Sequence, residues 1–309
     1  MSDFAASLQL GGVRMSGNGR PGDLSGGNPL ARRRALGAEL RRLRLGRALT
    51  AEQAARAIDR SGSWISRLES GKVGIRPREL HDLLDVYGVT GGSRRDRLEL
   101  LAVSGRERAW WSAYRDVVTE SFAVFIGIED SAESIFEYQE RVIPGLLQTE
   151  SYMRALFNRY AAVPEWGIAA AEIDRRIEVR LARQEILDRP RPPRLTVVID
   201  ESVVRRTVGG REIQRTQLRR LLDSIERGVD VRVLSFDSPA GPPVVPSFAI
   251  LRSHAGSETA CSETRDRAVT YDGDLASPYV TIGRWLLSVA LSSRNSERLI
   301  VEALSDMGV

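Results

Sequence analysis

Hydrophobic side chains recur at helical spacing through residues 29–105, and the spacing predicts a bundle of five helices. The first runs from Arg32 to Arg47 and presents a leucine face among arginines. Four more are expected, in the ranges 50–58, 61–70, 77–87 and 94–103. Only short polar or glycine-containing segments separate them, so the five helices have room to share one core.

The second and third helices lie within the stretch 49–72, LTAEQAARAIDRSGSWISRLESGK. Thr50 and Ser61 stand where helix N-caps are needed, and Gly71 stands where the second of these helices must stop. Asp59 and Arg60 are left to make a tight turn. Two short capped helices joined in this way are typical of a helix-turn-helix, although a generic helical hairpin has the same spacing.

Beyond residue 110 the pattern alternates between helices and strands. β-Branched runs at 195–200, 229–236 and 245–253 predict three strands, and a helix at 214–225 lies between the first two. Residues 131–143 are expected to form a helix that Pro144 ends, and residues 165–187 a long charged one. The segment 254–274 is more polar, which leaves further strand pairing open. Helices near 277–289 and 296–304 close the chain.

These elements predict a mainly α protein, with an N-terminal five-helix bundle and a C-terminal α+β or α/β domain. The small sheet has about three or more strands. We expect the first domain at residues 29–105 and the second at 106–309. Residues 1–28 are rich in glycine and predict a disordered tail, with a basic arm for the DNA minor groove as the alternative. Met15 is a second candidate start.

Positive charge is concentrated in the N-terminal part. Residues 29–110 carry 18 Lys and Arg against 10 Asp and Glu, whereas residues 111–309 carry 25 against 29. This asymmetry is expected when one end of a protein meets polyanionic DNA. The sequence has no apolar run of about 18 residues and no signal peptide. We therefore expect a cytoplasmic, nucleoid-associated protein without a membrane partner.

Candidate catalytic and metal-binding groups are sparse. Cys261 is the only cysteine, and the two histidines, His81 and His254, are far apart, so we expect no metal site. Asp200 and Glu201 end a predicted strand and could form a carboxylate pair, but adjacent strand residues face opposite ways, which favours helix capping. No phosphate-binding glycine motif occurs. We therefore expect neither a cofactor nor enzymatic activity.

The string WISRLESGK, at 64–72, resembles the signature of the Xre/lambda-repressor helix-turn-helix family, and the resemblance covers about residues 36–102. It implies a structural ion pair between Arg44 and Glu69. The family places the second helix of its motif, here residues 61–70, in the major groove. By position, the base-reading residues are then Gly62, Ser63 and Arg67. Arg67 is the strongest candidate, because a guanidinium can bond guanine O6 and N7 together.

The same resemblance implies that Thr50, Lys72 and Arg76 meet DNA phosphates on either side of the groove. For Lys72 and Arg76 the alternative is a solvated surface. Trp64 has two interpretations, packing against the bundle or apolar contact with a thymine methyl group. Glycine and serine at the start of the reading helix differ from the glutamines of other family members, so direct readout rests on few contacts.

The segment EYQERVIPGLLQTESY, with the earlier tryptophan pair and the later VIDESVVRRTVGG, is similar to the C-terminal domain of WhiJ-like actinobacterial regulators. The similarity spans roughly residues 110–304. It implies an effector domain that senses a small molecule or a small acidic partner protein. Around the proline break we expect an effector pocket, or else plain packing and surface charge, at a set of four residues: Glu137, Tyr138, Arg141 and Gln148.

The leading hypothesis is a transcription regulator that binds double-stranded operator DNA as a homodimer. Its C-terminal domain senses the effector. The rival is a protein-interaction module, antitoxin-like or anti-regulator-like, in which the helix-turn-helix docks a protein partner. The basic excess of residues 29–110 favours the DNA-binding hypothesis.

Overall fold

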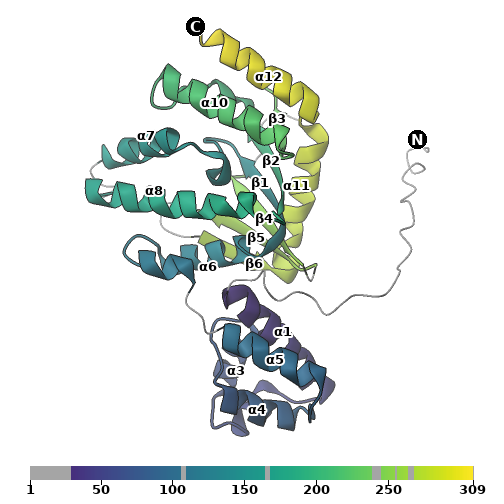
Figure 1. Ribbon diagram of the computed structural model, residues 1–309. Coiled ribbons are helices and arrows are strands. Elements are labelled where there is room, and N and C mark those ends of the chain that lie inside the picture. The colour runs from purple at the N-terminus through teal and green to yellow at the C-terminus, as the bar shows by residue number, and fades with distance from the viewer. Residues whose placement is uncertain are drawn as a thin grey trace, which may run out of the picture.

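The computed structural model describes residues 29–105, 109–163, 168–238, 245–254, 256–263 and 268–308. The predicted disordered tail at 1–28 lies outside these residues. The N-terminal part is the expected five-helix bundle, below the sheet domain in Figure 1. Its helices are α1 (Pro29–Gly46), α2 (Ala51–Arg56), α3 (Gly62–Glu69), α4 (Pro77–Val86) and α5 (Ser93–Ser104). Buried apolar residues from all five make one core, which includes Leu36, Leu40, Ile65 and Leu83, with alanines supplied by α2.

A six-stranded mixed sheet forms the centre of the C-terminal part, in the order β3-β2-β1-β4-β5-β6. The strands are β1 (Ala132–Gln139), β2 (Arg194–Asp200), β3 (Asp230–Leu234), β4 (Phe248–Ser253), β5 (Glu258–Glu263) and β6 (Ala268–Asp272). The first three run parallel, and the other three join them antiparallel. Parallel neighbours need helical crossovers, which the long helices between these strands supply.

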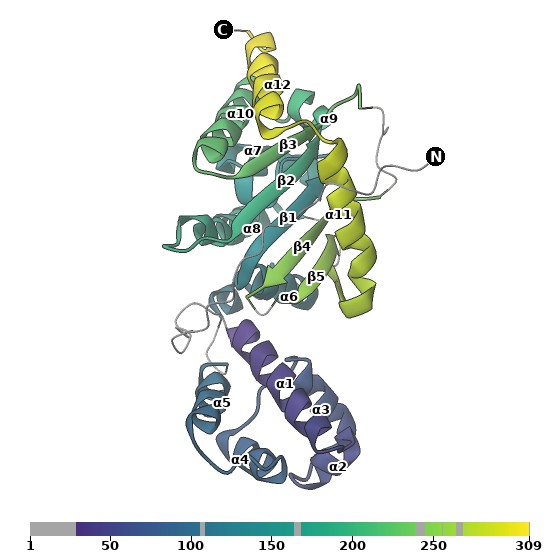
Figure 2. The same cartoon turned by 90° about the vertical axis from the view of Figure 1, so that its right-hand side faces the viewer.

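Helices cover both faces of this sheet, as Figures 1 and 2 show. The larger core lies between the sheet and helices that include α6, α7, α10 and α12, and the smaller one lies against α11. The helices are α6 (Glu120–Glu129), α7 (Glu150–Ala161), α8 (Ala170–Gln184), α9 (Glu201–Arg205), α10 (Arg211–Glu226), α11 (Ser277–Val289) and α12 (Ser293–Asp306). Single 3-10 turns are η2 (Trp110–Tyr114), η3 (Gly145–Leu147), η5 (Glu185–Asp188) and η6 (Gly273–Leu275).

The predicted helix at 131–143 is wrong, because residues 132–139 form β1, a central strand. Adjacent residues alternate between two buried faces: Ile135 enters the larger core, whereas Phe136 and Tyr138 pack on the α11 side. A strand covered on both faces lacks the polar alternation that would have identified it. The polar segment after β4 also forms strands, since β5 pairs with both β4 and β6.

One helix belongs to both halves of the protein. Leu30, at the start of α1, joins the larger core of the sheet domain, while Leu36 and Leu40 join the core of the bundle. Figure 2 shows α1 running from the underside of the sheet domain along α3. α1 is therefore a continuous connection between the two cores.

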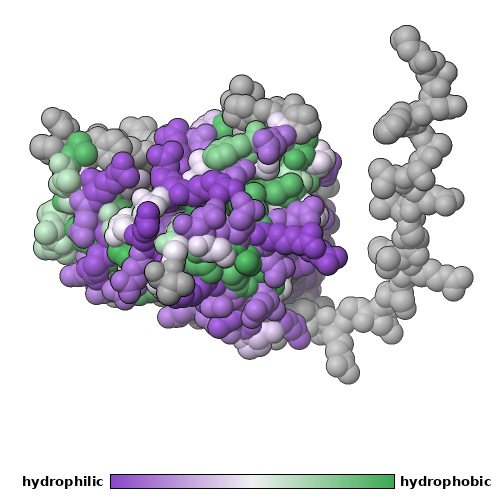
Figure 3. Space-filling model, turned by 90° about the horizontal axis from the view of Figure 1, so that it is seen from above, coloured by the Kyte–Doolittle hydropathy of each residue, from purple (hydrophilic) through white to green (hydrophobic). Residues whose placement is uncertain are grey.

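The protein surface is mixed in character. Seen from above in Figure 3, hydrophilic and hydrophobic residues are interspersed. Among the described residues, no helix combines the length and apolarity that crossing a bilayer requires.

Candidate nucleic-acid interface

The turn between α2 and α3 has the geometry of a helix-turn-helix. Thr50 caps α2, because its Oγ1 accepts a hydrogen bond from Gln53 N at 3.2 Å, and Gln53 Oε1 accepts one from Thr50 N at 2.8 Å. Asp59 adopts a left-handed conformation, φ 50°, as aspartate does more readily than most residues. Arg60 N then donates to Ala55 O at 3.0 Å and closes the turn that the sequence predicts at these positions.

The helix α3 buries one side and exposes the other. Ser61 caps it by accepting from Trp64 N at 3.2 Å, and Ile65 and Leu68 point into the bundle core. The exposed side carries Ser63, Ser66 and Arg67. Ser66 is absent from the predicted reading residues, although its position one helical turn from Ser63 would have placed it on this face.

Gly62 begins this helix beside Glu52. A Cβ at position 62 would lie 2.4 Å from Glu52 Oε1, the end of an exposed side chain that can move aside. Without a side chain, Gly62 can offer DNA only its backbone. Ser63 and Arg67 are therefore the two predicted reading residues that present side chains outward.

The predicted DNA-contacting cations are exposed on the surface of the bundle. Across the described parts of the chain, the exposed side chains of Arg67, Lys72 and Arg76 form no ion pair. The nearby Arg60 is different, because its Nη2 lies 2.5 Å from Glu79 Oε1 and its guanidinium stacks 5.2 Å from the Trp64 ring centroid. Trp64 is partly buried against the bundle core, as the packing interpretation predicts.

Arg44 and Glu69 tie the end of α3 to α1. Arg44 Nε lies 2.6 Å from Glu69 Oε1, and its Nη2 lies 2.9 Å from Oε2, which is a two-point contact. Arg44 Nη1 also donates to Leu49 O at 2.6 Å. The hydrogen bond to Glu69 raises the pKa of Arg44. This is the structural pair that the sequence resemblance implies, and it points away from a DNA-contacting role for either residue.

Two glycines let α1 and α3 approach closely. A Cβ on Gly37 would lie 2.5 Å from the carbonyl oxygens of both Leu68 and Glu69. Gly71 ends α3 with φ 73°, and a Cβ there would lie 2.8 Å from Arg34 N. The position of α3 is thus set directly by α1.

The four residues of the predicted effector pocket do not come together. Tyr138 is buried on the α11 side of β1, whereas Glu137 lies on the opposite face, next to Val197 and Ala249 of the larger core. Burial raises the pKa of Tyr138. The sequence predicted a helix here, in which adjacent residues diverge less than they do on a strand, so it did not anticipate this separation.

The other two members of the predicted pocket follow β1 in the chain. The Arg141 side chain is 80% exposed and lies 2.9 Å from Glu140. Gln148 is buried, donates to Ile143 O at 2.7 Å, and accepts from Arg180 at 3.4 Å. Gln148 thus holds the loop after β1 in place.

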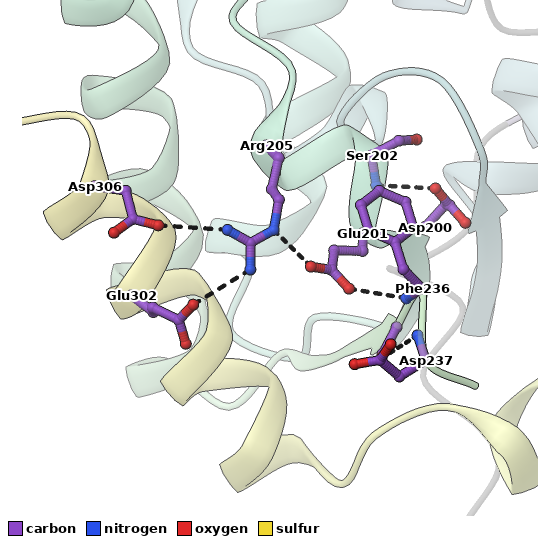
Figure 4. A network of polar contacts seen from close by, with 9 residues as sticks. Asp200, Glu201, Ser202, Arg205, Phe236, Asp237, Glu302 and Asp306 are labelled. Atoms are coloured by element: carbon purple, nitrogen blue, oxygen red, sulfur yellow. Dashed lines mark hydrogen bonds and ion pairs between the residues drawn. The ribbon is translucent and has the colours of Figure 1, made fainter.

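Asp200 and Glu201 also diverge (Figure 4). Asp200 caps α9 by accepting from Ser202 N at 2.9 Å. Glu201 Oε1 accepts from Arg205 Nε at 2.5 Å, and its Oε2 accepts from Phe236 N at 2.8 Å. Arg205 continues this network to Glu302 in α12 at 3.3 Å. The two carboxylates therefore hold structure together, in line with the capping interpretation.

Comparison with known families divides the chain in the same way as the fold. A family described as a helix-turn-helix domain matches residues 35–98, which lie within the five-helix bundle. A second, described as a domain of unknown function (DUF5753), matches residues 122–302 of the sheet domain. No curated protein and no solved structure shows a significant match to the chain.

Proposed function

Because the chain belongs to the DUF5753 family and carries a helix-turn-helix domain ahead of that domain, we propose that it is a sequence-specific transcription regulator. The observation that carries the proposal is the outward face of α3. There Arg67 is exposed and makes no ion pair in the described structure, with Ser63 one turn away. An uncompensated guanidinium on such a helix suits the paired acceptors of a guanine edge.

We assign the positioning of the protein on the DNA duplex to residues that flank α3. Lys72 and Arg76 follow α3 in exposed, unpaired positions, and Thr50 begins α2. Such groups contact phosphates, which fixes register without reading sequence. The excess of eight positive charges in residues 29–110 favours association with DNA over docking to a protein of mixed charge.

We further propose that the sheet domain controls the DNA-binding helices through α1. Leu30 packs in the core of the sheet domain, and Arg34 Nη2 lies 3.9 Å from Asp272 Oδ2 of β6. The backbone of the same Arg34 lies against Gly71, at the end of α3. A shift of α1 relative to the sheet domain would therefore move the recognition helix. The effector, a small molecule or a small acidic protein, would act by favouring one position of α1.

The proposal includes a two-fold homodimer that reads two half-sites about one DNA turn apart. Leu100 and Val103 support it, because they lie three residues apart on α5 and are 50% and 59% exposed. Sedimentation of the full chain would test it: a dimer mass is expected, and a monomer mass with and without DNA contradicts the dimer. A regulator of this kind would reside in the cytoplasm with the nucleoid, and the proposal assigns it no catalytic activity.

Selection of bound duplexes from a random library by the full chain tests the function. We expect one motif to be enriched, and its repeat to be two-fold symmetric. The Arg67→Ala variant should enrich no guanine at the contacted position, whereas Lys72→Ala should enrich the same motif more weakly. If the duplexes that the wild-type chain binds show no enriched motif, the proposal is contradicted.

A further inference from the structure

A hollow of about 380 Å³ lies where the amino ends of β2 and β3 meet the carboxyl end of α10. Its volume falls within the range of small-molecule sites. The walls come from three segments, at 187–188, 192–196 and 220–230. Leu187, Pro193, Leu195 and Val229 give part of the lining an apolar character.

Each charged residue of the lining except Arg220 lies close to a residue of opposite charge. Arg227 Nη1 lies 3.8 Å from Asp188, and Arg194 Nη2 lies 3.6 Å from Glu133 at the start of β1. The carboxylate of Asp230 accepts from Arg232 at 3.1 Å and from Ser293 at 2.7 Å.

Arg220 itself is half-buried. Every residue of the lining is described, and the Arg220 guanidinium has no hydrogen bond or ion pair to any described residue. The hollow therefore contains one positive charge without a counter-charge. A guanidinium in a concave, partly desolvated place favours a planar or tetrahedral oxyanion over other partners.

We propose that this hollow binds a small organic anion, with its carboxylate or phosphate on Arg220 and its apolar body against Leu195 and Val229. Arg194 and Arg227 stand at the same rim and are held only loosely by their acidic neighbours, so each can turn toward the anion. Contact with the apolar part of the wall removes the apolar body of the ligand from water, which favours binding.

The wall of the hollow is connected to the helix that holds α1. Arg189, which directly follows the lining residue Asp188, donates to Asp130 O at 2.7 Å, at the end of α6. On α6, Gly127 receives Leu30 of α1. The anion would thus act as the effector. This effector role rests on the proposed DNA-binding function, whereas binding of the anion does not depend on it.

Binding is tested by ligand-observed NMR titration of the full chain with benzoate and with phenyl phosphate. Benzyl alcohol and benzylammonium serve as neutral and cationic probes with the same ring. Benzoate, phenyl phosphate or both should bind saturably and more tightly than the neutral and cationic probes. The anion that binds more tightly identifies the preferred oxyanion as carboxylate or phosphate.

Arg220→Gln should weaken anion binding about tenfold, because it removes a charge-assisted hydrogen bond. The control Arg219→Gln alters the exposed neighbour outside the lining and should leave the affinity unchanged. Failure of both anions to bind, equal binding by Arg220→Gln and wild type, or preference for the neutral or cationic probe would overturn the proposal.

A second titration separates the effector role from the function. Saturating anion should change the affinity of the wild-type chain for its selected duplex by about fivefold or more, and that of Arg220→Gln by less than twofold. An unchanged affinity with the anion bound contradicts the effector role alone. Absence of DNA binding both with and without the anion contradicts the proposed function and leaves the NMR result standing.

Discussion

Leu30 in α1 lies directly against Gly127 in α6. A Cβ at position 127 would be 2.4 Å from Leu30 Cδ2, so the contact depends on glycine at that position. Leu30 is only 8% exposed, although it belongs to the same helix as the bundle residues Leu36 and Leu40. The contact of Leu30 with Gly127 is thus one part of the joint between the two domains, and it lies on a helix that also positions α3.

Replacing Gly127 with Leu should disconnect the domains without unfolding either one. The added side chain must displace Leu30, because core packing leaves no free space for it. The distance distribution between spin labels at Arg97→Cys and Arg219→Cys, in a Cys261→Ala background, should become broader. Gly46→Leu is the matched control, since a Cβ there meets nothing within 4 Å. An unchanged distribution in Gly127→Leu would show that the contact does not fix the domains.

Breaking the Arg44–Glu69 pair should strongly destabilise the bundle. Arg44→Met leaves the Glu69 carboxylate, whose side chain is 7% exposed, without its partner, and about 3 kcal/mol of unfolding free energy should be lost. The double variant Arg44→Met, Glu69→Met should recover most of that loss. Urea denaturation followed by circular dichroism measures both. Arg42→Met, in an exposed pair with Glu39, should cost far less stability than Arg44→Met.

Acid should weaken the bundle through Glu39. Hydrogen bonds from Arg42, and then from Arg94 of α5, lower the pKa of Glu39 to about 2 from 4.5. Since the folded-state pKa is the lower one, the stabilisation is complete above about pH 4.5 and is lost as the pH falls toward 2. Glu39→Gln should flatten the fall in stability over that interval, measured by urea unfolding at several pH values. Asp82→Asn, at an exposed position, should leave the slope as in the wild type.

Lys72→Ala should weaken binding to every duplex by a similar factor. Loss of one phosphate contact releases about one fewer counterion, so the slope of log Kd against log salt should decrease by about 1. Anisotropy titrations at several salt concentrations measure it. Arg211→Ala, an exposed arginine at the start of α10, is the control. A slope identical to wild type would place Lys72 outside the interface.

The bundle could be predicted from sequence because its determinants are local. Thr50 and Ser61 cap helices within three residues of themselves, and Gly71 ends one by its own conformation. The Arg44–Glu69 pair spans 25 residues, and it was found only through the family resemblance. The role of Gly37 was missed, because close approach between helices leaves no periodic signal in sequence.

The sheet domain was harder to predict because strand pairing is decided far along the chain. The strand β1 pairs with β2 and with β4, beginning 55 or more residues later, and both its faces are covered. Its residues Phe136 and Tyr138 therefore gave no polar alternation. β5, with polar residues such as Glu258 and Thr259, forms only because β4 and β6 flank it.

The anion site was equally invisible in sequence. Arg220 lies on α10 and meets a wall built from residues near 190, and nothing in a basic, amphipathic helix distinguishes this arginine from Arg219. Its lack of a counter-charge appears only when the three segments are placed together.

The most direct test of the account is the affinity of wild-type and Arg67→Ala chains for the selected duplex and for a duplex with its guanine replaced. Fluorescence anisotropy at one fixed salt concentration gives all four Kd values. The wild type should prefer the selected duplex by about tenfold or more, and Arg67→Ala should bind both duplexes equally, at the weaker affinity. The same preference in both chains, or no binding of either duplex, would contradict Arg67 as the base-reading residue, and absence of DNA binding would favour protein docking instead.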